Sequence, residues 1–232
     1  MRKDVELLGT RYAASLAAYG ATPQGLCWPN AADLATRFEV LLGGANLETY
    51  NPSNRLRLLD LGCGPGLLID YLAENGVLDY IDYTGIDVLD STVALARARW
   101  PNFSFESRDV RDRPFEAGRF DFCIVCGVFT GRFKVVYSEM EAMVRETLRA
   151  VWPSVRVGLA FNVMSKHVDW ERDDLFHWPL DDLVRFCKAH LSRHVSLRLD
   201  YGLWEASALV LKTPMARSSR VPACWMEDNA RT

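Results

Sequence analysis

The spacing of apolar residues predicts two helices before residue 50. In the first segment, apolar residues recur at steps of four, four and three: Leu8, Tyr12, Leu16 and Tyr19. These steps match the repeat of an α-helix, and Gly20 is suited to end it. Asn30 can cap a second helix over residues 31–42, which Gly43 and Gly44 would stop. We therefore expect residues 1–50 to form a helical cap.

From Leu56 onward, short apolar runs alternate with amphipathic segments. The expected strands are residues 56–61, 83–88, 102–107, 119–126, 155–163, 194–200 and 204–212, and the expected helices are 67–75, 91–100, 138–151 and 180–191. The last two strands are joined by three residues, which is too short for a parallel crossover. We predict a doubly wound α/β fold: a mostly parallel, seven-stranded sheet whose last strand is antiparallel, with an N-terminal helical extension.

Length and composition point to a single domain. A chain of 232 residues is long enough for one sizeable α/β domain and short for two. We assign residues 51–212 to a ligand-binding domain and residues 213–232 to a flexible tail. The net charge of −3 gives no sign of a basic nucleic-acid surface, so a nucleic-acid partner is disfavoured.

The chain shows no secretory or membrane features. Acidic residues stand at the N-terminus where a signal peptide needs an apolar run, and no run of about 18 apolar residues occurs. The six cysteines are irregularly spaced, which argues against a disulfide framework. We expect a cytoplasmic protein, without a membrane partner, that is a monomer or a homodimer.

The most informative segment is Leu58-Leu-Asp-Leu-Gly-Cys-Gly-Pro-Gly66. It leads from a strand through a glycine turn into a helix, and glycines allow a ligand to approach the main chain closely. A dinucleotide fingerprint needs glycine or alanine where this chain has Leu67. Asp60 would repel a pyrophosphate but attract a cationic sulfonium ligand that carries an amino group. These two residues disfavour an NAD-dependent oxidoreductase.

This segment resembles motif I of class I methyltransferases that use S-adenosylmethionine (AdoMet) and release S-adenosylhomocysteine. The resemblance implies that an acid and a glycine loop hold the methionine part of AdoMet: Asp60, Gly62, Cys63, Gly64 and Gly66. It also implies that Asp87 accepts the ribose hydroxyls and that Val88 packs on the adenine. Asp109 and Val110 resemble the pair that meets the adenine amino group and ring. No metal is expected.

Residues 120–127 resemble motif IV, whose end, here Cys126, faces the sulfonium. Cys123 and Cys126 lie three apart in an expected strand, so they point to opposite faces and favour core packing over a metal site. Asp109 could instead pair with a nearby arginine such as Arg111. Tyr12 and Tyr19 could form a lid over the cofactor or belong to a buried helix face.

Candidate acceptor-side residues come from three segments. A hydroxyl acceptor must lose its proton, and His167 and His177 flank a polar insertion expected to overhang the carboxyl edge of the sheet. We take both as candidate bases. The loop after the fourth strand and the N-terminal region supply the candidate substrate-binding residues Phe129, Arg132, Trp28 and Arg37.

The N-terminal pattern around Tyr12, Trp28 and Arg37 resembles small bacterial methyltransferases of small-molecule or glycan clusters. We therefore expect methyl transfer to a small-molecule acceptor, at a hydroxyl of a sugar or natural product. A nucleic-acid methyltransferase is disfavoured because the end of motif IV reads Cys-Gly-Val-Phe, without an Asn/Asp-Pro-Pro motif or a Pro-Cys nucleophile. A protein methyltransferase and an AdoMet-binding protein without transfer activity stay open as alternatives.

Overall fold

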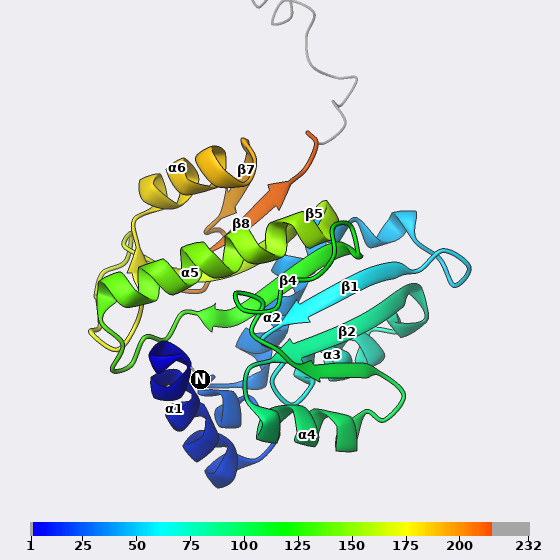
Figure 1. Cartoon of the computed structure of the whole chain (residues 1–232), viewed down its shortest axis with the longest axis horizontal. Helices are drawn as coiled ribbons and strands as arrows, with labels where there is room; N and C mark the ends of the chain where they lie inside the picture. The colour runs from blue at the N-terminus through cyan, green and yellow to red at the C-terminus, as the bar shows by residue number, and fades with distance from the viewer. Residues whose placement is uncertain (1, 215–232) are drawn as a thin grey trace, which may run out of the picture.

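The computed structural model describes residues 2–214 as a twisted sheet between two helical layers (Figure 1). Its strands are β1 (Leu56–Leu61), β2 (Ile81–Asp87), β3 (Ser104–Ser107), β4 (Phe120–Phe129), β5 (Val155–Ser165), β6 (His177–Trp178), β7 (His194–Arg198) and β8 (Glu205–Leu211). The strand order is β3-β2-β1-β4-β5-β8-β7, and the two-residue β6 pairs with β5. From β1 the chain adds β2 and β3 on one side of the sheet, and it then returns to place β4 on the other side of β1. This reversal of the strand order opens a crevice at the carboxyl ends of β1 and β4.

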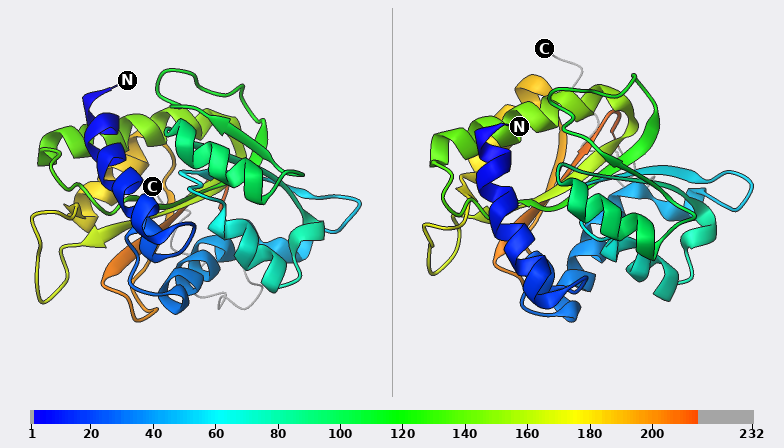
Figure 2. Two further views of the ribbon diagram at one scale, coloured as in Figure 1. Left: turned by 90° about the horizontal axis from the view of Figure 1, so that it is seen from below. Right: turned by 60° about the horizontal axis from the view of Figure 1, so that its bottom comes forward.

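Helices cover both faces of this sheet. They are α1 (Lys3–Tyr19), α2 (Ala31–Leu42), α3 (Leu67–Glu74), α4 (Asp90–Arg99), α5 (Tyr137–Val151) and α6 (Leu180–His190). Short 3₁₀ turns cover Gln24–Leu26, Gly43–Ala45, Leu47–Thr49, Leu78–Tyr80 and Trp152–Ser154. Side chains of α5 and α6 fill one core, and those of α2, α3 and α4 fill the other. Helix α1 lies beyond the carboxyl ends of the central strands (Figures 1 and 2).

The predicted fold class is confirmed. Strands β1 to β5 pair in parallel, whereas β8 is antiparallel to both β5 and β7. The two local helix signals also hold: Gly20 follows α1 with a positive φ of 66°, and the Asn30 side chain accepts a hydrogen bond from the Asp33 N–H at the start of α2. The short β6 was not predicted, because it lies inside the polar insertion.

Several predicted element ends differ from those in the structure, among them one end of β4 and one of α4. Strand β4 continues to Phe129, past the expected end at residue 126, because a register shift between Val125 and Phe129 lets the strand pair with β5 again. Helix α4 begins at Asp90, one residue before the expected start at residue 91. Leu89 takes the cap position, and its N–H is bound by the Asp87 carboxylate at 3.0 Å.

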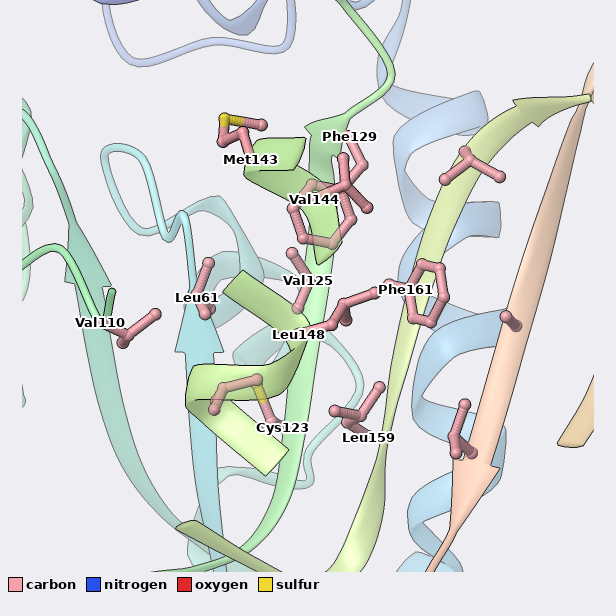
Figure 3. Packing of buried hydrophobic residues seen from close by; sticks show 14 of the residues in the cluster. Leu61, Val110, Cys123, Val125, Phe129, Met143, Val144, Leu148, Leu159 and Phe161 are labelled. Carbon is pink, nitrogen blue, oxygen red and sulfur yellow. The ribbon is translucent and has the colours of Figure 1, made fainter. Parts of the chain in front are cut away.

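The two cores explain the cysteine pair on β4. Cys123 is fully buried in the core under α5, where Figure 3 shows it beside Leu148 and Leu159. Cys126 is only partly buried and packs against the opposite core. The two thiols therefore lie on opposite faces of the sheet, and the predicted packing role of Cys123 fits this placement.

Residues 2–214 include no helix that is both long enough and apolar enough to cross a membrane. The tail predicted for residues 213–232 falls, from residue 215 onward, outside the described part of the chain.

The central packing of β5 gives the first prediction. Replacing the fully buried Leu159 with Ala should lower the free energy of unfolding by about 2–5 kcal/mol, because it removes apolar contacts and leaves a cavity. Leu199→Ala is the matched control, since that side chain is 44% exposed, and it should cost less than about 1 kcal/mol. Urea unfolding measures both. Equal losses would contradict the assignment of the core.

Candidate functional site

The glycine loop between β1 and α3 has a backbone that only glycine adopts readily. Gly62, Gly64 and Gly66 have φ values of 79°, 55° and 84°, which is the left-handed region. A side chain at Gly62 would collide with Val128. The N–H groups of Gly62 and Cys63 both donate to the carbonyl of Ile86, at 2.8 and 2.9 Å. The loop is thereby fastened to the end of β2.

Asp87, the last residue of β2, joins the loop from the other side. Its Oδ2 accepts a hydrogen bond from the Gly64 N–H at 3.1 Å, and its Oδ1 accepts one from the Leu89 N–H at 3.0 Å. Burial raises the pKa of this carboxyl above its usual value. Each carboxylate oxygen can accept more than one hydrogen bond, so both oxygens can also bind a ligand.

A cavity of about 960 Å³, counted out to its mouth in solvent, lies against this loop. Seven of the residues predicted to meet the cofactor line it: Gly62, Gly64, Asp87, Val88, Asp109, Val110 and Cys126. The structure therefore brings these seven residues together at one cavity, and their role toward a cofactor stays a prediction.

The lining of this cavity fits AdoMet. One end carries the Asp87 carboxylate, which suits vicinal ribose hydroxyls, and nearby Val88 and Val110 offer apolar surface for a flat ring. The buried hydroxyl of Thr92, also in the lining, has no hydrogen-bond partner among residues 2–214. An unpaired buried hydroxyl is costly, so a polar ligand atom would satisfy it.

Three predicted cofactor residues lie behind the loop and not in the cavity lining described for residues 2–214. Cys63 is buried, Gly66 contacts Trp100, and Asp60 is buried with Oδ2 accepting a hydrogen bond from the Tyr83 hydroxyl at 2.6 Å. Burial, together with the nearby charge of Asp87, raises the pKa of Asp60 to about 7 despite that hydrogen bond. These residues support the glycine loop on the side that faces away from the cavity.

Asp109 faces the cavity and also holds an arginine, so both roles considered for it are compatible with the structure. Arg111 donates to both of its oxygens, and the same guanidinium pairs with Asp4 of α1. Burial opposes the charged form of Asp109, but the hydrogen bonds from Arg111 outweigh it and hold its pKa below the usual value. Arg2 bridges to Asp112 at 2.8 Å. These ion pairs fix the first turn of α1 beside the cavity.

Helix α1 forms a wall of the cavity. Its contributing residues are Val5, Leu8, Gly9, Tyr12 and Leu16. Tyr12 lines the cavity, whereas Tyr19 is exposed, so the two tyrosines do not share a role. Sequence reasoning did not assign Leu8 and Leu16 to the site, although their helical spacing with Tyr12 was the available signal.

A second cavity adjoins the first, and Tyr12, Leu26 and Trp28 line both. The predicted Trp28 and Arg37 meet there: the Arg37 guanidinium lies 3.9 Å from the centre of the Trp28 ring. Arg37 also forms an ion pair with Glu205 of β8, with Nε and Oε1 2.5 Å apart. Burial raises the pKa of Glu205, against the opposing effect of Arg37.

Two predicted substrate-binding residues face away from the described lining of both cavities. Phe129 is fully buried in the core, where it packs edge-to-face on Phe161 with ring centres 5.9 Å apart (Figure 3). It was mistaken for a loop residue because β4 runs further than expected. Arg132 turns back on its own loop and donates to the Val135 carbonyl at 3.0 Å. The prediction was wrong for both, although Phe133 does line the second cavity.

The two histidines are not placed to act as bases. His177 is buried in β6, where Nδ1 bonds the Ser165 carbonyl at 2.7 Å and Nε2 accepts from the Arg172 N–H at 3.2 Å. Both ring nitrogens are thus occupied by the backbone, which corrects its assignment as a base. His167 is exposed on the insertion and absent from the described lining of either cavity.

Sequence reasoning missed the residues that dominate the second cavity. These are Glu205, with Trp204 beside it, and Trp170 from the insertion. An acid at the start of an otherwise apolar last strand was the available signal for Glu205. Its partner Arg37 lies far away in the sequence, so the pairing could not be inferred.

The fold and the cavity against the glycine loop define a class I methyltransferase, and comparisons agree. A family model described as a methyltransferase domain matches residues 58–154. The Mycobacterium tuberculosis protein named "Putative methyltransferase Rv1506c" is 35% identical over 171 residues, covering 72% of this chain and 99% of that protein. The chain therefore belongs to the family of class I, AdoMet-dependent methyltransferases.

Solved structures share the fold. The 1,6-didemethyltoxoflavin-N1-methyltransferase of Burkholderia thailandensis, with bound 1,6-didemethyltoxoflavin and S-adenosylhomocysteine, is 16% identical with a TM-score of 0.58, covering 92% of each chain. Magnesium protoporphyrin IX methyltransferase from Synechocystis PCC 6803, with bound S-adenosylhomocysteine, is 14% identical with a TM-score of 0.56, covering 91% of this chain and 98% of that one. At such identities the likeness concerns the fold.

The raised pKa of Asp60 predicts a pH effect on stability. Its folded pKa of about 7 lies above the unfolded value of about 3.9, so between these values the native state binds more protons than the unfolded state. This group therefore lowers the free energy of unfolding as pH rises from about 4 to about 7, by about 2 kcal/mol between pH 5 and 7.

Asp60→Asn should remove this contribution, so that the stability difference between variant and wild type changes with pH. Urea unfolding at pH 5, 6, 7 and 8 measures it, with the exposed Asp82→Asn on the same sheet as control. Parallel stability curves for wild type and Asp60→Asn would show that Asp60 titrates normally.

Proposed function

We propose that this enzyme transfers a methyl group from AdoMet to a hydroxyl of a small molecule, a sugar or another natural product. The observation that carries the proposal is the pair of adjoining cavities, which share Tyr12, Leu26 and Trp28 as lining. One suits the cofactor and the other can take an acceptor. Because the two cavities share lining residues, they lie next to each other. In this proposal the two ligands are therefore neighbours, as direct methyl transfer requires.

In this proposal the cofactor lies with its ribose at Asp87, its adenine between Val88 and Val110, and its methionine part along the backbone of Gly62 and Gly64. The support is the contact geometry of the loop and the free accepting capacity of Asp87. Bound AdoMet supplies an electrophilic methyl group. Cys126, in the lining near the end of β4, is the residue we place beside the sulfonium.

Catalysis would then depend mainly on alignment and on exclusion of water. The acceptor oxygen would bond to the methyl carbon as the carbon–sulfur bond breaks, and the hydroxyl proton would pass to a carboxylate in the lining of the second cavity, for which Glu205 is the candidate. An in-line displacement of this kind gains most from fixed orientation in a water-poor cleft. Helix α1 and the loop that carries Trp28 cover the cleft, since both contribute to its walls.

The chemical class of the acceptor is supported by the polar side chains in the lining of the second cavity, Arg37 and Glu205 among them. The Burkholderia thailandensis structure holds 1,6-didemethyltoxoflavin together with S-adenosylhomocysteine, so small-molecule acceptors occur within this architecture. A cytoplasmic setting is part of the proposal, and the five cysteines within residues 2–214 are free thiols.

The cofactor site is tested by calorimetric titration with S-adenosylhomocysteine. Wild type should bind it, and Asp87→Ala should weaken binding by about 100-fold, because two hydrogen bonds to a charged group are lost. Asp82→Ala, an exposed acid on the same strand, is the matched control and should bind as wild type does.

NAD should not bind measurably in the same experiment. Tight binding of NAD, or unchanged binding of S-adenosylhomocysteine by Asp87→Ala, would overturn the proposed cofactor site. Retained thermal stability of the variant shows that a loss of binding does not come from unfolding.

A further inference from the structure

A buried charged pair forms the polar floor of the second cavity. Arg37 is 7% exposed and Glu205 is 2% exposed, yet both belong to the cavity lining. The Arg37 Nε and the Glu205 Oε1 are close, at 2.5 Å, but are not aligned as a hydrogen bond. Nη1 of Arg37 has no hydrogen-bond partner within residues 2–214. The pair therefore keeps an unused donor, Nη1 of Arg37, which is costly for a buried site without a ligand.

Hydrogen bonds connect this charged pair to the residues that line the cofactor cavity. Oε2 of Glu205 accepts a hydrogen bond from the Asn162 side-chain amide at 2.5 Å, and Oδ1 of Asn162 accepts one from the Gly127 N–H at 2.8 Å. Gly127 follows Cys126, and both line the cofactor cavity. A molecule held by the charged pair thus lies close to the place where the methyl group would be presented.

Tryptophans also line the second cavity. Trp170 from the insertion and Trp204 from the turn before β8 have ring centres 6.2 Å apart, and Trp204 is 51% exposed. Trp28 adds a third indole beside the charged pair. Aromatic faces carry partial negative charge and attract the weakly positive C–H bonds on one face of a saturated ring such as that of a sugar.

The charges around the cavity are balanced. Its lining holds three arginines and three acids among the described residues: Arg11, Arg37, Arg172, Asp33, Asp174 and Glu205. A phosphate or carboxylate acceptor would meet as many acids as bases, which does not favour an anion. A neutral ligand whose groups both donate and accept hydrogen bonds fits this lining better.

We propose that the second cavity binds a neutral sugar, whose ring stacks on Trp170 and Trp204 and whose neighbouring hydroxyls bind Glu205 and Arg37. A hydroxyl both donates and accepts, so one hydroxyl can donate to the carboxylate while its neighbour accepts from the guanidinium. Arg37 and Glu205 thereby orient one sugar oxygen toward the cofactor. The inference rests on the proposed function, because it names the acceptor class for that site.

The test uses the full-length protein saturated with S-adenosylhomocysteine. The probes are the methyl glycosides of rhamnose, fucose, mannose, glucose and galactose, with catechol as a flat, neutral comparison compound. Calorimetry measures binding, and mass spectrometry with AdoMet measures methylation of the same probes. We expect at least one glycoside to bind with a Kd below about 10 mM and to bind more tightly than catechol.

Trp204→Ala should weaken the binding of that glycoside by about tenfold, and Glu205→Gln should weaken it by at least as much. Tyr80→Ala, which removes an exposed aromatic ring outside both cavities, is the control and should leave glycoside binding unchanged. S-adenosylhomocysteine should bind all three variants as it binds wild type. Binding of S-adenosylhomocysteine also shows whether Glu205→Gln has folded. If it has not, Trp204→Ala still tests the proposal, because the Trp204 side chain is exposed.

Different results would overturn the sugar-binding inference and the proposed cofactor site. If S-adenosylhomocysteine binds but no glycoside binds or is methylated, or if catechol binds more tightly, the sugar inference is overturned while the cofactor site stands. Unchanged glycoside binding by Trp204→Ala also overturns it. If S-adenosylhomocysteine itself does not bind, the proposed function fails and the inference fails with it.

Discussion

The hydrogen bond from the Gly64 N–H to the Asp87 carboxylate is the contact on which the site depends. It joins the glycine loop after β1 to the end of β2, and the other oxygen of Asp87 binds the N–H of Leu89 at the start of α4. One side chain therefore fixes three segments around a single cavity. The left-handed glycines make this approach possible, because a side chain at Gly62 would collide with Val128.

A second chain of contacts organises the acceptor side. It runs from Trp28 through Arg37, Glu205 and Asn162 to the backbone of Gly127. It links the N-terminal cap, the last strand and the end of β4, which are distant in the sequence. Burying a charged pair costs free energy that apolar side chains would not. The pair lies in the lining of the second cavity, where a bound ligand can use its polar atoms.

The sequence predicted best what local physics determines. Gly20 and Asn30 act within one turn of their helices, and the glycine loop with Asp87 follows a fixed strand–turn–helix pattern. Other expectations depended on tertiary contacts. Phe129 could not be assigned to the core, because the register shift that prolongs β4 arises from pairing with β5.

Polar residues were the hardest to interpret from the sequence. A histidine in a polar segment looks the same whether it faces a substrate or, like His177, binds the backbone through both nitrogens. Glu205 gave no sign of its partner, because Arg37 comes from a helix near the other end of the chain. The cavity for the cofactor could be predicted, and the polar floor of its neighbour could not.

The most direct measurement is a crystal structure of the protein with S-adenosylhomocysteine. The account predicts both ribose hydroxyls within hydrogen-bond distance of the Asp87 carboxylate, and the sulfur atom beside Cys126, facing the cavity floored by Arg37 and Glu205. A cofactor bound elsewhere, or one with its sulfur turned away from that cavity, would contradict it.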